Sequence, residues 1–301
     1  MHGGGGELAS LGPLVGLARL RAGEIGRDEY TAAWGHRCPE EFELAAPRPA
    51  EDPGWPENAP DPGDPGALLA RQAQARDAAW RRLEQRHPRR ARKVGALLGE
   101  AAAAGRLREL ARSELIRVVG VLRAFLLRVR ELTGHDAFFL TFAEVAALLA
   151  GDDSATSAIP ARRAAYDRYR ALPPYPSLIR GRFDPFDQPP ARDGAITGFP
   201  GVPRVVEGVV RVVATPADGA ALRQGEILVA RSTNVGWTPL FPRAAAVVTD
   251  VGAPLSHAAI VARELGIPAV VGCGDATARL TTGDRVVVDG ARGTVTPVGR
   301  G

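Results

Sequence analysis

The sequence predicts an α+β protein in which a helical N-terminal region precedes a smaller, β-rich C-terminal domain. Apolar residues at helical spacing dominate residues 67–172, whereas short β-branched runs bounded by turn residues begin at residue 204. The stretch between them, residues 172–203, is rich in proline and glycine, as extended connectors are. We therefore expect a helical region over residues 1–182, a Pro-rich linker over 183–201 and a β-rich domain over 202–301.

Length and composition indicate a globular protein. The chain has 301 residues, of which 45% are hydrophobic, enough to bury a core. No apolar run approaches the roughly 20 residues of a membrane span, and the first residues lack the pattern of a signal peptide. The two cysteines, Cys38 and Cys273, support neither a disulfide framework nor a zinc site. We expect a cytoplasmic protein without a metal ion of its own.

The charge is basic and comes almost entirely from arginine. The net charge is +4 and the pI about 9.6, and Lys93 is the only lysine. Arginine is the better bidentate partner for phosphate. Acidic and basic residues are interspersed, however, and no basic stripe with interleaved aromatic residues is present. We interpret the charge as compositional and expect neither nucleic acid nor a membrane as a partner.

The helical region contains several start and stop signals. Residues 6–24 predict a short amphipathic helix, and residues 67–132 predict two or three helices punctuated by Pro88 and Gly105. Thr141 and Glu144 form a capping box that predicts another helix start. A very basic helix is expected over 161–172.

A turn at residues 35–39 carries polar side chains. His36 and Cys38 lack the further ligands that a metal site needs. We expect a structural turn in which Arg37 pairs with Glu40 or Glu41.

The C-terminal domain should be built from short strands with one or two helices. The β-branched runs lie at residues 204–213, 225–231, 245–250, 268–272, 284–290 and 293–298.

One histidine stands at a predicted strand-to-helix turn. Ser256 is a good N-cap residue, so His257 falls in the first helical turn, where backbone N–H groups and the helix dipole favour an anion. The dipole also favours the neutral imidazole, which is the nucleophilic form. His257, Ile260 and Glu264 should lie at the rim of a buried stripe, which is formed by Ala258, Val261, Ala262 and Leu265.

Each of these residues also has a structural explanation. A lone histidine is more often structural than catalytic. Thr233 and Asn234 can bond phosphate oxygens with Trp237 shielding them, or the three can form a packed turn. Arg263 can neutralise a phosphoryl group, or it can pair with Glu264 or Asp250. Arg108 and Arg112 stand four residues apart and so share one helix face, with Glu109 adjacent, and this face is either functional or simply solvated.

The C-terminal motifs nevertheless resemble a known domain. They read G-E-I-L-V, S-T-x-x-x-W-T-P-L-F, T-D-x-G-A-P-L-S-H-A-A-I-V-A-R-E-L-G-I-P-A-V-V-G and G-D-x-V-x-V-D-G-x-x-G. The segment 225–298 resembles the swivelling phosphohistidine domain of phosphoenolpyruvate (PEP) synthase, pyruvate phosphate dikinase and rifampicin phosphotransferase. The resemblance implies a β/β/α fold and identifies His257 as the phosphoryl carrier. From their side-chain chemistry and their expected place near this histidine, Ser256, Thr233, Asn234 and Arg263 are the candidate phosphate-binding residues. Val251-Gly252 stands where the family usually has Gly-Gly, so we expect a slightly different entry turn.

The N-terminal region is similar to the acceptor side of the same family. GHRCPEEFELAAPR and DAFFLTFAEV match stretches of rifampicin phosphotransferase-like proteins, and Arg108-Glu109 with Arg112 resembles their R-E-x-x-K/R motif. This resemblance implies acceptor-side roles for Arg108, Glu109 and Arg112.

Family members transfer the β-phosphoryl group of ATP to the histidine and then to an acceptor. Neither their ATP-grasp domain nor the PEP-binding barrel is recognisable in this sequence. We therefore expect ATP and Mg²⁺ to be bound by a separate ATP-grasp nucleotide-binding protein or subunit, and the acceptor to be an unidentified small molecule. Two alternatives stay open: a truncated, inactive homologue that acts as a binding or regulatory module, and a helical scaffold protein.

Overall fold

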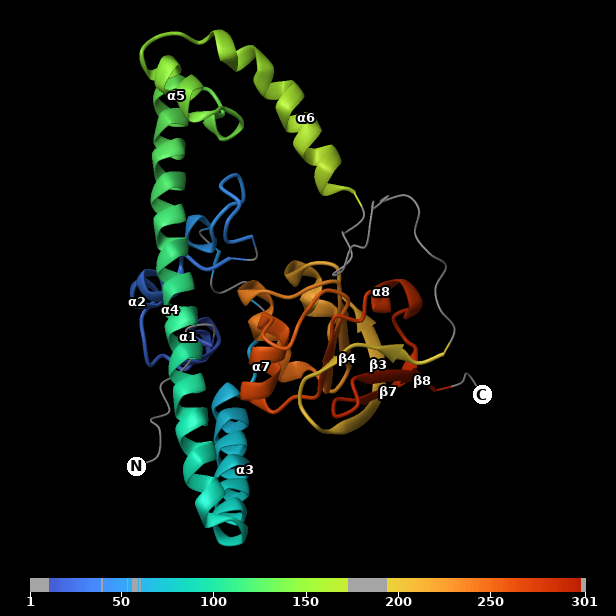
Figure 1. Cartoon of the computed structure of the whole chain (residues 1–301). Helices are drawn as coiled ribbons and strands as arrows, with labels where there is room; N and C mark the ends of the chain where they lie inside the picture. Colours follow the sequence, from blue (N-terminus) through green and yellow to red (C-terminus); the bar gives the residue numbers. More distant parts are fainter. Residues whose placement is uncertain are drawn as a thin grey trace.

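The computed structural model describes residues 11–38, 40–52, 54–55, 59, 61–172 and 194–298. The predicted helix start before Leu11 and most of the predicted linker therefore lie outside the described residues. The long helix α4 (Pro88–Thr133) runs the height of the molecule, with shorter helices along it and a sheet domain beside it (Figure 1). The chain is thus α+β, as expected. None of the helices in the described ranges has an apolar stretch that would let it cross a membrane.

The first two helices pack tightly on each other. They are α1 (Gly12–Arg21) and α2 (Arg27–Trp34). A side chain at Gly12 or Gly16 would collide with the Trp34 indole, so the two glycines let this ring lie on α1. A short 3-10 turn, η1 (Pro49–Glu51), follows.

Two long helices then form a hairpin, α3 (Pro65–Arg86) and α4 (Pro88–Thr133). Pro88 begins the second helix, as expected, because proline is tolerated in a first turn. The predicted break at Gly105 is wrong, since α4 continues through it. A helical glycine costs only about 1 kcal/mol, and the alanines and leucines around it favour the helix. Helix α4 ends at Gly134, which adopts a left-handed φ of +75°.

The helical part ends with four short elements, η2 (Ala137–Phe139), α5 (Phe142–Leu149), η3 (Ser154–Ala158) and α6 (Ile159–Arg170). The predicted capping box is confirmed at α5. Thr141 N donates to Glu144 Oε2 at 2.8 Å, and Glu144 N donates to Thr141 Oγ1 at 3.4 Å.

The C-terminal part is a sheet with strand order β1-β8-β7-β3-β4-β5-β6-β2. Strands β3, β4, β5 and β6 run parallel, and the other neighbours are antiparallel. The six predicted strands are all present, as β3 (Val205–Val212), β4 (Ile227–Ala230), β5 (Ala246–Thr249), β6 (Ala269–Val271), β7 (Arg285–Asp289) and β8 (Thr294–Pro297).

Two strands were not predicted, β1 (Ile196–Thr197) and β2 (Phe199–Pro200). They fall inside the stretch that we expected to be linker. β1 pairs with β8 and β2 pairs with β6, at opposite edges of the sheet. Because only Gly198 separates them, the two edges meet and the sheet closes on itself.

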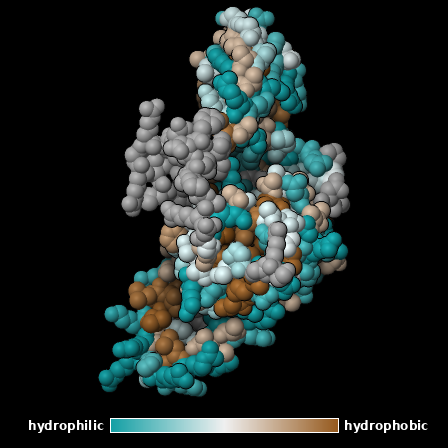
Figure 2. Space-filling view, turned by 90° about the vertical axis from the view of Figure 1, so that its right-hand side faces the viewer, coloured by the Kyte–Doolittle hydropathy of each residue, from teal (hydrophilic) through white to brown (hydrophobic). Residues whose placement is uncertain are grey.

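Helices cover both faces of this sheet. The connections are η4 (Pro216–Ala221), η5 (Val235–Arg243), α7 (His257–Leu265) and α8 (Ala276–Arg279). One core lies under α7 and η5, and the other lies against α8. Leu11 and Leu14 belong to the α7 core, so the helical part is packed directly onto the sheet domain. The surface seen in Figure 2 is mixed, with apolar areas among hydrophilic ones.

Candidate functional site

His257 is the first residue of α7, as predicted. The side chain of the N-cap residue Ser256 accepts a hydrogen bond from Ala259 N at 3.5 Å. The predicted stripe of α7 is buried, while His257 is half-buried at its rim. The histidine is therefore fixed at a helix N-terminus on the side of the sheet domain that faces α4 (Figure 1).

The turn that leads to the histidine requires a glycine at residue 252. A Cβ on Gly252 would lie 2.8 Å from Val271 Cβ and 3.2 Å from Ser256 Oγ. Val251, by contrast, has no positive φ, and its N–H donates to Arg231 O at 2.8 Å. The structure thus imposes no glycine-only conformation on Val251.

Two threonine hydroxyls hold the imidazole. Thr233 Oγ1 lies 3.3 Å from Nδ1, and Thr238 Oγ1 lies 3.2 Å from Nε2. The Phe241 ring meets the imidazole edge-on, with centroids 6.0 Å apart. The sequence interpretation missed Thr238, although it stands inside the S-T-x-x-x-W-T motif. It is fully buried, which only the fold reveals.

The environment keeps His257 neutral. Burial, together with the nearby charges of Arg37 and Arg112, lowers its pKa from 6.5 to about 3. A neutral imidazole has a free lone pair on one nitrogen, so His257 can act as a nucleophile at neutral pH.

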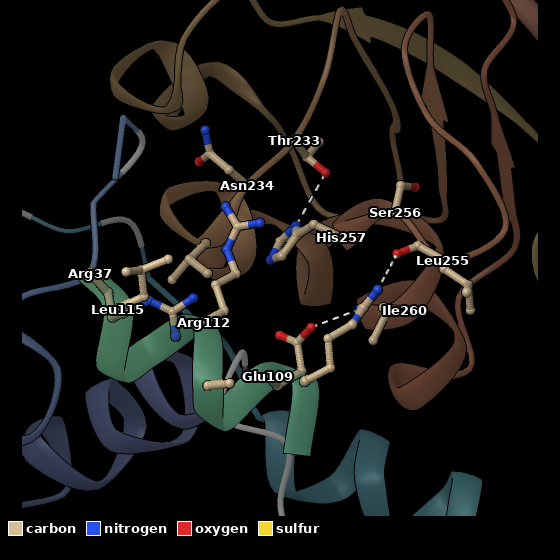
Figure 3. A pocket seen from close by; sticks show the side chains of 13 residues that line it. Arg37, Glu109, Arg112, Leu115, Thr233, Asn234, Leu255, Ser256, His257 and Ile260 are labelled. Carbon is tan, nitrogen blue, oxygen red and sulfur yellow. Dashed lines mark hydrogen bonds and ion pairs between the residues drawn. The ribbon is translucent and has the colours of Figure 1, made fainter. Parts of the chain in front are cut away.

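A cavity of about 480 Å³ opens beside this histidine, between α4 and the sheet domain (Figure 3). One wall comes from α4 and the turn after α2, and the other from α7 and the segment around η5. The lining residues are Arg37, Arg108, Glu109, Ala111, Arg112, Leu115, Thr233, Asn234, Val235, Leu255, Ser256, His257 and Ile260.

The fold brings together most of the residues singled out in the sequence. The cavity is lined by all the acceptor-side residues, Arg108, Glu109 and Arg112, and by all the phosphate-binding candidates except Arg263. Arg263 is exposed in the last turn of α7, where its Nη2 donates to Pro254 O at 3.3 Å. It does not line the cavity.

The arginines on α4 are held in place by hydrogen bonds. Arg108 donates to Leu255 O at 3.2 Å and to Glu109 Oε1 at 2.8 Å, and so links α4 to the loop before His257. Arg112 donates through Nε and Nη2 to Glu41 Oε2, at 3.0 and 2.9 Å. This helix face therefore lines the cavity and is tied to the loop before α7 and to Glu41.

Glu41 also holds the third cation of the cavity. Arg37 Nε donates to Glu41 Oε1 at 2.5 Å, which confirms the predicted pairing of Arg37 in its turn. The sequence interpretation missed that Arg37 lines the cavity. The pairing of Arg37 with Glu41 could be predicted from residues close together in the sequence. The position of α4 beside this turn could not be predicted in that way.

The remaining polar residues of the turn have structural partners. His36 Nε2 lies 2.8 Å from Ser113 Oγ, and Arg48 contacts Cys38 Sγ. Within the described ranges, no three metal-ligating side chains come together.

Comparisons with known proteins agree with this arrangement. Residues 222–293 match the family described as PEP-utilising enzyme, mobile domain. An uncharacterised protein of Mycobacterium tuberculosis is 36% identical over 280 residues, covering 87% of this chain and 30% of that protein. Rifampicin phosphotransferase of Streptomyces sviceus is 31% identical over 309 residues, covering 92% and 35%. Phosphoenolpyruvate synthase of Aeropyrum pernix is 48% identical over 107 residues, covering 35% and 13%.

The chain spans about a third of the length of the first two relatives and less of the third. The matched segment contains His257, both threonines that hold it and the whole of α7. Over residues 222–293 the chain carries the mobile domain of the PEP-utilising enzymes.

Proposed function

We propose that this chain is the phosphohistidine carrier and acceptor-side part of an ATP-dependent phosphotransferase. One observation carries the proposal: a neutral histidine at a helix N-terminus faces a cavity lined by Arg37, Arg108 and Arg112. A nucleophile beside a set of guanidinium groups suits phosphoryl transfer, because that reaction depends on positioning and on offsetting negative charge. The names of the relatives support the same class of reaction.

The chemistry on His257 is two displacements at phosphorus. In the first, a nitrogen of His257 forms the P–N bond to the β-phosphorus of ATP while its P–O bond to AMP breaks, and water then removes the γ-phosphoryl group as inorganic phosphate. In the second, an oxygen of the acceptor forms the new P–O bond, the P–N bond breaks and the acceptor hydroxyl loses its proton. The hydroxyls of Thr233 and Thr238 orient the ring, and the proton of the neutral imidazole stays on the nitrogen that does not react.

The cavity suits the second displacement. Arg108 and Arg112 come from α4 and are already anchored, so they can meet a phosphoryl group on His257 without reorganising. Glu109 anchors Arg108, and Leu115 with Ile260 offers an apolar surface to the acceptor. The first displacement needs ATP and Mg²⁺, which we assign to an ATP-grasp protein or subunit.

The test is phosphorylation of the chain by that partner. The chain is mixed with Mg²⁺, ATP radiolabelled in the β-phosphoryl group, and a cognate ATP-grasp protein. We expect acid-labile label on His257, lost in His257→Ala and retained in His87→Ala, whose histidine is exposed at the α3–α4 junction. A mixture that labels another residue and leaves His257 unmodified would overturn the proposal.

A further inference from the structure

Helix α4 has a side on which large apolar residues are exposed. Its packed side carries Ile116, Leu126 and Val129, which are buried. The opposite side exposes large apolar side chains: Leu107 (67% exposed), Val118 (57%), Val121 (69%), Phe125 (49%) and Leu132 (61%). Soluble monomers seldom expose a contiguous apolar surface of this kind, so the stripe indicates a contact surface.

The spacing of the exposed positions along α4 indicates what kind of partner fits the stripe. Positions 104, 107, 111, 114, 118, 121, 125, 128 and 132 alternate steps of three and four residues, and all are exposed. This is the seam of a two-helix coiled coil, in which each side chain fits between side chains of the facing helix. The stripe therefore fits another long helix.

The charged residues of the seam indicate which long helix packs against the stripe. The charged members of the seam are Glu114 and Arg128, which lie seven residues before and seven residues after Val121. Each forms an ion pair only along its own helix, Glu114 with Arg117 at 3.3 Å and Arg128 with Glu131 at 2.9 Å, and both pairs are exposed. Exposed ion pairs contribute little to stability, so Glu114 and Arg128 remain available to pair with charges on another helix.

We propose that α4 pairs antiparallel with α4 of a second copy of this chain, centred near Val121. In that arrangement Glu114 of each copy lies within about one helical turn of Arg128 of the other, so opposite charges meet twice. The same arrangement removes Val118, Val121 and Phe125 from water. The charged cavity residues Glu109 and Arg112 face away from the seam toward the sheet domain, and Ala111 is the seam position that also lines the cavity.

Sedimentation equilibrium of the whole chain tests the pairing. We expect a dimer at micromolar concentration, and a monomer for Val121→Glu and for Phe125→Glu. The control is Val205→Glu, which adds the same charge at an exposed valine of β3 (63% exposed) and should remain dimeric. Circular dichroism should match the wild type in all three variants. A wild-type chain that stays monomeric throughout the concentration range overturns the proposal, whether or not a different protein binds the stripe.

Charge reversal tests the antiparallel direction. Glu114→Arg alone and Arg128→Glu alone should each weaken the dimer about tenfold, because like charges then face each other. The double variant should restore wild-type affinity. In a parallel pair each residue would face its own equivalent, and neither single change would create a new mismatch. Single variants that dimerise as tightly as the wild type, or a double variant without recovery, would rule out the antiparallel arrangement.

Discussion

At the scale of single residues, the imidazole of His257 is held between hydroxyl groups rather than beside a carboxylate. A carboxylate partner would favour the charged imidazolium, which has no lone pair for attack. The hydroxyls of Thr233 and Thr238 can each donate or accept, so they match the neutral ring in either tautomer. Arg37 and Arg112 further disfavour protonation. The same two cations would stabilise the ring once it carried a phosphoryl group.

This environment makes a prediction about pH. The pKa of His257 is lowered from 6.5 to about 3, so NMR titration of the folded protein should find its ring neutral at pH 5. The unfolded chain binds this proton at higher pH, so protonation favours unfolding. The contribution of the neutral ring to stability is complete above about pH 6.5 and is lost as the pH falls toward 3.

Chemical denaturation of wild type and His257→Gln isolates this contribution. The free energy of unfolding of the wild type should fall more steeply between pH 6.5 and 4 than that of the variant. His36, whose pKa is lowered to about 4, titrates in the same window but is present in both proteins and cancels. Parallel pH profiles would show that the ring is not held neutral by the fold.

At the scale of elements, the loop from β5 to α7 depends on close packing at Gly252. The missing side chain lets the loop lie against Val271 and Ser256, and so sets where α7 begins. Gly252→Ala should lower the free energy of unfolding by about 1–3 kcal/mol, because the new methyl group overpacks a buried site. The perturbed NMR signals should include those of the His257 ring.

The matched control is Gly99→Ala, in the middle of α4. A Cβ there meets nothing within 4 Å, so the same change should stabilise the protein by about 0.5–1 kcal/mol through helix propensity. Chemical denaturation of both variants gives the comparison. Equal effects at the two sites would contradict the tight turn.

The elements differed in how far the sequence could predict them. The strands β3 to β8, the capping box of α5 and the start of α7 follow from local patterns, and the structure confirms them. The strands β1 and β2 are only two residues long and owe their pairing to β8 and β6, so no local pattern marks them. For the same reason, local patterns did not show that Arg37 and Thr238 belong to the site, because contacts between distant segments bring them there.

At the scale of the whole molecule, the candidate site exists because two parts of the chain are packed against each other. Leu11, the N-cap residue of α1, and Leu14 of α1 enter the core beneath α7. Arg108 bonds to Leu255 O, and Gln72 Nε2 of α3 donates to Arg263 O at 3.1 Å. In this arrangement His257 faces the cavity beside α4. Under the proposed function, His257 also receives a phosphoryl group from a separate protein, and for that step it must become accessible from outside. The strength of the contacts between the helical part and the sheet domain then determines how often His257 is accessible.

The contact of Gln72 offers a test of that coupling that needs neither donor nor acceptor. Gln72→Glu replaces an amide donor with a carboxylate directed at the carbonyl of Arg263, and so should weaken the packing of α3 on α7. Gln74→Glu makes the same change at an exposed position of α3, and its glutamine has no hydrogen bond to the sheet domain among the described residues. We expect diethyl pyrocarbonate to modify His257 several-fold faster in Gln72→Glu than in the wild type, and at the wild-type rate in Gln74→Glu. Peptide mass spectrometry measures the rate at this histidine, and at pH 6 the ring is neutral in all three proteins, so the rate reports access. Equal rates in all three would mean that the α3–α7 contact does not control the exposure of His257.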